Sequence, residues 1–218
     1  MPKIYVLGAG PGSAAYLPQV TAELAGQCDV LVGGKRNLAL FDGRGREVIE
    51  ITGHLDPVIA EIREKSVSKR VGVLVSGDTG IYSLLPRLAK EFGRENLAVY
   101  PGISPVQYFF ARLGRCWHET RMVSLHGRSL DDLADLARGD DTVVVFTDPD
   151  NSPAAVCRRL VEAGVTGVRV FIGEDLSYPE EKISTGRPED FINYRSSDLN
   201  LVIIEPNSRD GGGSSVRY

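Results

Sequence analysis

The sequence predicts an α/β protein built of two α/β domains, and three observations predict it. Short β-branched apolar runs alternate along most of the chain with segments whose apolar residues have helical spacing. Several of these runs end in a glycine-containing loop, which is typical of buried parallel strands that lead into helices. The alternation stops at residues 114–119 and then resumes, which favours a domain boundary there.

These observations divide the 218 residues into three parts. They are an N-terminal α/β domain over residues 1–115, a C-terminal α/β domain over residues 116–207, and a Gly/Ser-rich tail over residues 208–218 that is predicted to be disordered. A hydrophobic content of 42% is enough for a sizeable core.

The N-terminal domain is predicted to contain five strands and four helices, which alternate over most of its length. We expect strands at 3–7, 30–32, 47–51, 71–75 and 97–100, and helices at 18–26, 55–65, 81–92 and 106–113. The helix over 55–65 has the clearest pattern because Leu55, Val58, Ile59 and Ile62 recur at helical spacing with charges between them.

The C-terminal domain repeats this alternation with one difference. We expect strands at 122–125, 142–146, 169–172, 182–185 and 201–205, and helices at 130–138 and 153–163. Ser152 is the expected N-cap of the second helix, and Pro153 lies in its first turn. The connection over 178–181 is too short for a helical crossover, so this sheet is expected to be partly antiparallel.

A candidate binding loop follows the strand that begins at Val71. Gly77 and Gly80 allow the main chain to approach a ligand closely, and Asp78 offers an acceptor for an ammonium or hydroxyl group. The alternative is an ordinary strand-to-helix turn in which Asp78 is only an N-cap. A second glycine-containing loop, 101–105, follows the next strand, so a parallel sheet would place the two loops side by side at one edge.

The first glycine-rich loop, 8–13, resembles a dinucleotide fingerprint but lacks its two discriminating features. Ser13 stands where that fingerprint needs glycine or alanine, and Lys35 and Arg36 follow the second strand where a ribose-binding acid would lie. A nicotinamide-dependent reductase is therefore disfavoured. The loop still offers backbone amides to an anionic or bulky ligand, and the alternative is a glycine turn needed only for packing.

Composition excludes several classes of function. The net charge of −4 disfavours a nucleic-acid or membrane-surface partner. Cys28, Cys116 and Cys157 lack the spacing of a metal site or a disulfide framework, so we expect no metal and a reducing cytoplasmic location. Neither a signal peptide nor a membrane span is predicted.

Taken in order, these motifs resemble the tetrapyrrole methylase family of S-adenosylmethionine-dependent enzymes. The resemblance rests on Gly8-Ala9-Gly10-Pro11-Gly12, Ser76-Gly77-Asp78-Thr79-Gly80-Ile81-Tyr82 and Pro101-Gly102-Ile103-Ser104, and it covers nearly the whole chain. The longer segments 32–38, 106–112 and 124–128 are most similar to the members that methylate carbon 5 of a corrin precursor, cobalt-precorrin-7 or precorrin-6Y, in cobalamin biosynthesis. The resemblance implies a homodimer whose subunits each hold the cofactor in the cleft between their two domains.

The resemblance also implies a set of site residues. Cofactor contacts would fall on Gly77, Asp78, Ile81, Ser104, Pro105, Thr147, Glu174, Leu199 and Asn200. The loop that contains Gly10, Pro11 and Gly12 would face the tetrapyrrole. Ser13 departs from the acidic residue that relatives usually carry there, so no carboxylate role is assigned to that loop.

The substrate of such an enzyme carries acetate and propionate carboxylates. Lys35, Arg36, Arg112 and Arg128 are the basic residues expected around it, and the alternative for each is solvated surface charge. His126 is a candidate acid/base residue beside Arg128, although both also fit an exposed turn. A sulfonium methyl group is already a strong electrophile, so alignment and exclusion of water are the main tasks of the protein, and no catalytic residue is assigned.

Other functions stay open at this point. The acceptor of the same chemistry could be uroporphyrinogen, another precorrin or RNA, although the charge disfavours RNA. A nicotinamide-dependent reductase and a non-catalytic tetrapyrrole carrier are the alternatives from other classes. Some relatives carry a second domain for decarboxylating methylation at carbon 15, and a separate partner protein is expected to supply that step here.

Overall fold

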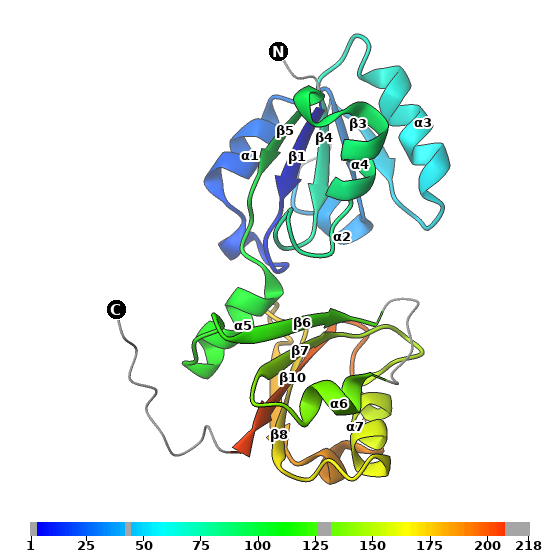
Figure 1. Ribbon diagram of the computed structural model, residues 1–218. Coiled ribbons are helices and arrows are strands. Elements are labelled where there is room, and N and C mark those ends of the chain that lie inside the picture. The colour runs from blue at the N-terminus through cyan, green and yellow to red at the C-terminus, as the bar shows by residue number, and fades with distance from the viewer. Residues whose placement is uncertain (1–3, 42–44, 126–131, 208–218) are drawn as a thin grey trace. The chain divides into compact units, whose positions relative to one another are not determined.

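The computed structural model describes residues 4–41, 45–125 and 132–207, and the chain divides into two compact units (Figure 1). Unit 1 is Met1–Tyr108 and unit 2 is Phe109–Tyr218. The division falls inside helix α5 (Pro105–Leu113), earlier than the expected boundary after residue 115. The predicted disordered tail, 208–218, lies outside the described residues.

Unit 1 is built on a five-stranded parallel sheet in the order β3-β2-β4-β1-β5. Its strands are β1 Ile4–Gly8, β2 Val30–Gly33, β3 Glu47–Glu50, β4 Val71–Val75 and β5 Leu97–Tyr100. Its helices are α1 Gln19–Gly26, α2 Lys35–Leu38, α3 Leu55–Lys65 and α4 Leu85–Phe92, with short 3-10 turns at Ala14–Tyr16 and Arg94–Asn96. All five predicted strands are therefore present, each within one or two residues of its expected end.

Both faces of this sheet are buried at its central strands, which explains why β1, β2 and β4 are almost entirely apolar. Val71, Val73 and Val75 of β4 pack into one core together with α3 and Leu88 of α4. Leu74 points to the opposite face and packs with Leu31 and with the region of α1. Figure 1 shows α3 and α4 on one side of the sheet and α1 on the other. Alternating side chains thus fill two cores from one strand.

Unit 2 has a five-stranded mixed sheet in the order β6-β7-β10-β8-β9. Its strands are β6 Thr120–Ser124, β7 Thr142–Phe146, β8 Val168–Glu174, β9 Lys182–Gly186 and β10 Asn200–Pro206. Its helices are α6 Leu133–Ala137 and α7 Pro153–Glu162, with a 3-10 turn at Pro188–Phe191. β10 is antiparallel to both β7 and β8, and β9 is antiparallel to β8, which confirms the expected antiparallel part.

The core of unit 2 lies between its sheet and the helices α6 and α7. Val143, Val170 and Val202 contribute from three neighbouring strands, and Val156 and Leu160 contribute from α7. The Ser152 hydroxyl accepts a hydrogen bond from the Ala155 amide at 3.4 Å, which confirms it as the N-cap of α7.

One helix begins later than the sequence predicts. We expected a helix from Ile81, whereas α4 begins at Leu85. Tyr82 has a φ of 44°, which no right-handed helix accommodates, and the Ser83 hydroxyl accepts a hydrogen bond from the Leu85 amide at 3.1 Å. The apolar spacing therefore marked the correct segment but not its first turn. The expected helix over 130–138 is α6 in its described part, and residues 126–131 lie outside the described residues.

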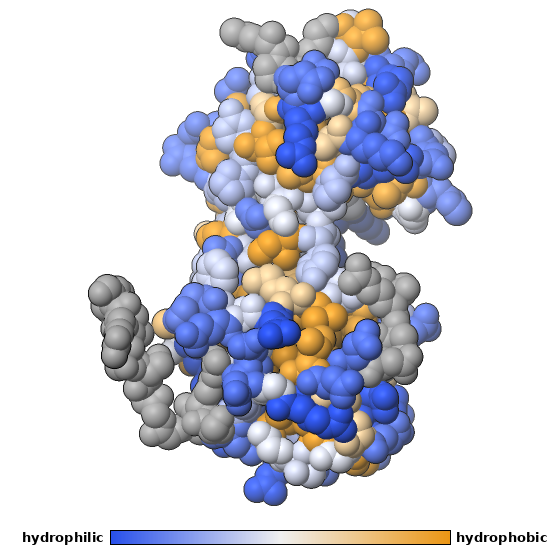
Figure 2. Space-filling view, in the orientation of Figure 1, coloured by the Kyte–Doolittle hydropathy of each residue, from blue (hydrophilic) through white to orange (hydrophobic). Residues whose placement is uncertain are grey.

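The surface shows no sign of a membrane segment among the described residues, where no helix has the length and apolar character needed to cross a bilayer. Figure 2 shows hydrophilic side chains interspersed with smaller hydrophobic areas on the visible face of each unit. The exposed large apolar side chains come from different elements, for example Val48 of β3, Val67 after α3 and Val99 of β5. No cluster of three or more His, Cys, Asp or Glu side chains suited to a metal ion occurs within the described parts of the chain.

The three cysteines are expected to differ in how fast their thiols react, because two are buried and one is exposed. Burial raises the pKa of the Cys28 thiol to about 11 and that of Cys157 to about 12, whereas Cys116 is exposed. We expect one of the three thiols of the native protein to react rapidly with a disulfide reagent at about pH 8, and all three to react after unfolding. A Cys116→Ser variant should lose the rapid phase, and a second rapidly reacting thiol would contradict this assignment.

Candidate functional site

Three loops meet at the carboxyl edge of the unit 1 sheet. They follow β4, β1 and β5, which are neighbours in that sheet, so the expectation that glycine-containing loops lie together is confirmed. The Gly77 amide donates to the Gly10 carbonyl at 2.7 Å, and the Gly10 amide donates to the Gly77 carbonyl at 3.3 Å. These two hydrogen bonds continue the sheet for one antiparallel step beyond its parallel strands.

The glycines of these loops are needed because backbone packs directly on backbone. A Cβ atom on Gly8 would lie 2.4 Å from the Gly102 nitrogen, and one on Gly102 would lie 2.2 Å from the Gly77 oxygen. Gly77 also has a φ of +67°, and a Cβ atom there would lie 2.7 Å from Cδ of Pro105. Every other residue type would force these loops apart.

Asp78 holds two of the loops together. One carboxylate oxygen accepts a hydrogen bond from the Gly80 amide at 2.8 Å, and the other accepts one from the Gly102 amide at 3.1 Å. Since α4 begins at Leu85, Asp78 is not its N-cap, and that alternative is wrong. The side chain instead fixes the loop after β4 against the loop after β5.

Ser104 and Pro105 begin α5 on this edge. Ser104 is fully buried, its hydroxyl accepts from the Gln107 amide at 3.0 Å, and its own amide donates to Oε1 of Gln107 at 2.9 Å. This reciprocal pair is a capping box. Ile81 is half-buried and Ile103 is exposed, so the loops present main chain and apolar side chains rather than charges.

Helix α2, which follows β2, is tied to the same edge. Asn37 is buried and accepts a hydrogen bond from the Ser76 hydroxyl at 3.2 Å. Lys35 and Arg36, the two predicted substrate contacts beside it, are exposed. The predicted contacts Gly10, Pro11 and Gly12 lie after β1, where Gly10 has a φ of +82°. All ten predicted site residues of unit 1 thus follow the carboxyl ends of its strands.

In unit 2 the predicted cofactor contacts also lie at neighbouring strand ends. Thr147 follows β7, Asn200 begins β10, and Glu174 ends β8 directly opposite Asn200 in the sheet register. The Thr147 hydroxyl donates to Oδ1 of Asn200, and the Asp175 amide donates to the Leu199 carbonyl at 2.8 Å. The structure therefore brings Thr147, Glu174, Leu199 and Asn200 together.

The carboxylate of Glu174 is buried and has several partners. The Tyr194 hydroxyl donates to Oε2, and the Ser197 amide donates to Oε1 at 2.9 Å. Lys182 lies 3.6 Å from Oε2. The hydrogen bond with Tyr194 and the nearby Glu174 charge raise the pKa of Lys182 above its ordinary value, so its ammonium group stays protonated.

Arg112, a predicted substrate contact, has a partner within unit 2. Its Nε donates to Oε1 of Glu181 at 2.8 Å, and the other oxygen of Glu181 accepts from the Ser177 amide at 2.8 Å. A substrate carboxylate would therefore compete with Glu181 for this guanidinium. His126 and Arg128, the remaining predicted contacts, lie outside the described residues.

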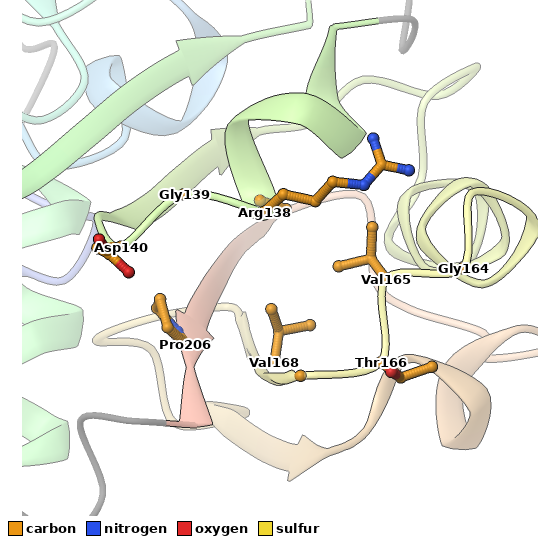
Figure 3. Close-up of a pocket in the computed structure, with 10 residues that line it drawn as sticks. Arg138, Gly139, Asp140, Gly164, Val165, Thr166, Val168 and Pro206 are labelled. Atoms are coloured by element: carbon orange, nitrogen blue, oxygen red, sulfur yellow. The ribbon is translucent and has the colours of Figure 1, made fainter.

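One hollow of unit 2 lies at the opposite edge of its sheet. It has a volume of about 450 Å³ and includes Val168 at the start of β8 and Pro206 at the end of β10 (Figure 3). Arg138 extends along it, but its guanidinium already pairs with Asp135 at 2.5 Å and donates to the Ala163 carbonyl at 2.6 Å. This hollow contains none of the predicted site residues.

Several residues of this edge were not singled out from the sequence. Asn37 and Ser76 form a hydrogen bond across 39 residues, and Tyr194 reaches Glu174 across 20 residues. No local pattern signals such contacts, because they depend on which strands become neighbours. Gly102 lay inside a quoted motif, but its close approach to Gly77 appears only once β4 and β5 flank β1.

Comparison with known sequences gives a consistent set of relatives. The profile of the family described as Tetrapyrrole (Corrin/Porphyrin) Methylases matches residues 3–191. The cobalt-precorrin-7 C(5)-methyltransferase of Salmonella typhimurium is 33% identical over 91% of this chain and 96% of that protein. A probable cobalt-precorrin-7 C(5)-methyltransferase of Methanocaldococcus jannaschii is 27% identical over 93% of this chain and 97% of its own.

Comparison with solved structures supports the fold. The methyltransferase CobJ superposes with a TM-score of 0.80 at 19% identity, over 94% of this chain and 95% of the other. A precorrin-6Y methylase of Archaeoglobus fulgidus gives 0.71 at 23% identity, over 93% and 97%. A uroporphyrin-III C-methyltransferase of Thermus thermophilus, complexed with S-adenosylhomocysteine, gives 0.74 at 22% identity, over 95% and 99%.

The glycine contacts predict a position-specific effect on stability. Gly102→Ala should lower the free energy of unfolding by about 1–3 kcal/mol, because its Cβ atom would collide with the Gly77 carbonyl. Chemical denaturation measures the change. Gly26→Ala is the control, since nothing lies within 4 Å of a Cβ atom there. Equal stability of the two variants would show that the loops do not pack as described.

Proposed function

The chain belongs to the tetrapyrrole (corrin/porphyrin) methylases, and we propose that it transfers a methyl group from S-adenosylmethionine to carbon 5 of a corrin precursor. The observation that carries this proposal is the match to named cobalt-precorrin-7 C(5)-methyltransferases over nearly the full length of both chains. The substrate would be cobalt-precorrin-7 or precorrin-6Y. Because the chain belongs to this family, the alternative of a nicotinamide-dependent reductase is excluded.

The residues at the strand ends fit such a cofactor. S-adenosylmethionine has an adenosine part that needs apolar contacts and backbone hydrogen bonds, and a sulfonium group that tolerates no nearby cation. The loops after β4 and β5 provide main-chain groups, Ile81, Ile103 and the single carboxylate of Asp78. We propose the contacts Gly77, Asp78, Ile81, Ser104 and Pro105 in unit 1, and Thr147, Leu199 and Asn200 in unit 2.

The bound cofactor would supply an electrophilic methyl group, so the protein needs no nucleophile of its own. The rigid glycine loops would hold the acceptor carbon at a fixed distance and direction. Because Ser104 is already committed to capping α5, its contribution would come through its position in the main chain. Proximity and exclusion of water would then supply most of the rate enhancement.

We propose that exposed cations hold the carboxylates of the corrin precursor. Lys35 and Arg36 are exposed at the edge that also bears Gly10, Pro11 and Gly12. Arg112 would exchange its bond to Glu181 for one to the substrate. His126 and Arg128 stay predictions from the sequence.

Two further proposals concern assembly. We propose a cytoplasmic homodimer, and a separate partner that performs decarboxylating methylation at carbon 15. The relatives include proteins named for methylation at carbon 5 alone, such as that of Salmonella typhimurium, and proteins named for both carbons 5 and 15, such as that of Sinorhizobium, which supports this division of activities.

The function is tested first by binding and then by product analysis. We expect S-adenosylhomocysteine to bind with micromolar affinity in a calorimetric titration and NADH not to bind. Incubation with S-adenosylmethionine and cobalt-precorrin-7 or precorrin-6Y should then add one methyl group, which NMR places on carbon 5. Methylation of uroporphyrinogen instead would overturn the acceptor, and binding of NADH alone would overturn the class.

Asp78→Asn tests the cofactor loop. The amide can keep one of the two backbone bonds but not both, so the loops after β4 and β5 loosen and S-adenosylhomocysteine should bind about tenfold more weakly. Asp29→Asn is a matched control. Asp29 also accepts a hydrogen bond from a distant backbone amide, that of Arg70 at 2.8 Å, but at the opposite ends of the strands.

Asp29→Asn keeps its single backbone bond through the amide oxygen, so it should retain both stability and affinity, whereas Asp78→Asn should lose affinity. Wild-type affinity in Asp78→Asn, or an equal loss in Asp29→Asn, would show that the Asp78 bonds do not shape the site.

A further inference from the structure

Both carboxylate oxygens of the buried Glu174 already accept hydrogen bonds from groups within unit 2. The residue is 4% exposed, and Tyr194 and Ser197 each donate to a different oxygen. A carboxylate is costly to bury unless it is paired and hydrogen-bonded. These partners therefore account for the presence of the charge at the end of β8.

Through Ser197, this carboxylate is connected to the two predicted cofactor contacts next to it in the chain. The Ser197 hydroxyl donates to the Leu199 carbonyl at 3.1 Å, and the Asn200 amide group donates to the Ser197 carbonyl at 2.7 Å. Asn200 in turn accepts from the Thr147 hydroxyl. Hydrogen bonds within the segment from Ser197 to Asn200 thus fix its conformation, and its first residue is bonded to Glu174.

Tyr194 fixes the other side of Glu174. Its ring packs edge-on against Phe191, with centroids 5.3 Å apart, and the Lys182 ammonium lies 4.8 Å from its centroid. Its oxygen is also 2.9 Å from the Ser184 hydroxyl, and because the Tyr194 proton goes to Glu174, Ser184 is the donor of that bond. The phenol is held on three sides, so it can direct the carboxylate toward the Ser197 amide.

We propose that Tyr194 and Glu174 are positioning residues for the cofactor: they hold the segment from Ser197 to Asn200 in the conformation in which Leu199 and Asn200 contact it. This inference rests on the proposed function. It changes the role predicted for Glu174, which acts through the Ser197 amide rather than by touching the cofactor. It also adds Tyr194, which no sequence motif indicated.

Tyr194→Phe is the direct test because it keeps the ring and removes only the hydroxyl. We expect S-adenosylhomocysteine to bind about tenfold more weakly and the KM for S-adenosylmethionine to rise by a similar factor. At saturating cofactor, kcat and the KM for the corrin substrate should stay at wild-type values. A merely structural role would lower kcat and stability together without this division. Tyr178→Phe, in the β8–β9 connection, is the matched control and should bind like wild type.

Hydrogen exchange of the wild-type chain provides a second readout that needs no substrate. The Ser197 amide should exchange faster in Tyr194→Phe than in wild type, and S-adenosylhomocysteine should slow exchange over residues 197–200 in wild type.

The outcomes separate the two proposals. If wild type does not bind S-adenosylhomocysteine, the proposed function fails. If wild type binds but Tyr194→Phe binds equally well, or if the ligand leaves exchange over residues 197–200 unchanged, only the positioning role fails.

Discussion

The contact of backbone with backbone at Gly8, Gly77 and Gly102 is the constraint on which the rest of unit 1 depends. It requires three strands to end at the same level, and the parallel register of β4, β1 and β5 provides this. It also requires three residues without side chains at the points of approach. A side chain at any of these positions would collide with main-chain atoms or with a proline ring, and no rotamer change can relieve such a collision.

In unit 2, side chains rather than glycine contacts hold the loop at the strand ends in place. Its strand ends come from a mixed sheet, so the neighbours of Glu174 include the start of an antiparallel strand and a loop that returns from a 3-10 turn. Main-chain contacts alone cannot order such a loop, and a buried carboxylate with directed partners does so instead. The cost of burying that charge is offset only while each partner is in place, which makes the network cooperative.

The sequence was sufficient for the parts of the fold that depend on local pattern. The strand at 71–75 and the helix at 55–65 follow directly from β-branched runs and helical spacing, and the match of motifs in order identified the family. The start of α4 was wrong because Tyr82 adopts a positive φ that its residue type does not suggest. Contacts such as Ser76 with Asn37 and Tyr194 with Glu174 could not be predicted, because each joins segments whose proximity is decided by strand order.

The glycine loops of unit 1 have a consequence for specificity. A loop built from main chain can bind a cofactor but cannot easily distinguish acceptors, since substitution of its glycines destroys it before it changes a preference. Under the proposed function, discrimination would reside in side chains that lie beside the loops without supporting them. Lys35 and Arg36, which are exposed, and Pro11, which is half-buried, are the candidates. Under the proposed function, related methylases can share one fold across different tetrapyrroles, because the residues that hold the loops in place are not those that would face the acceptor.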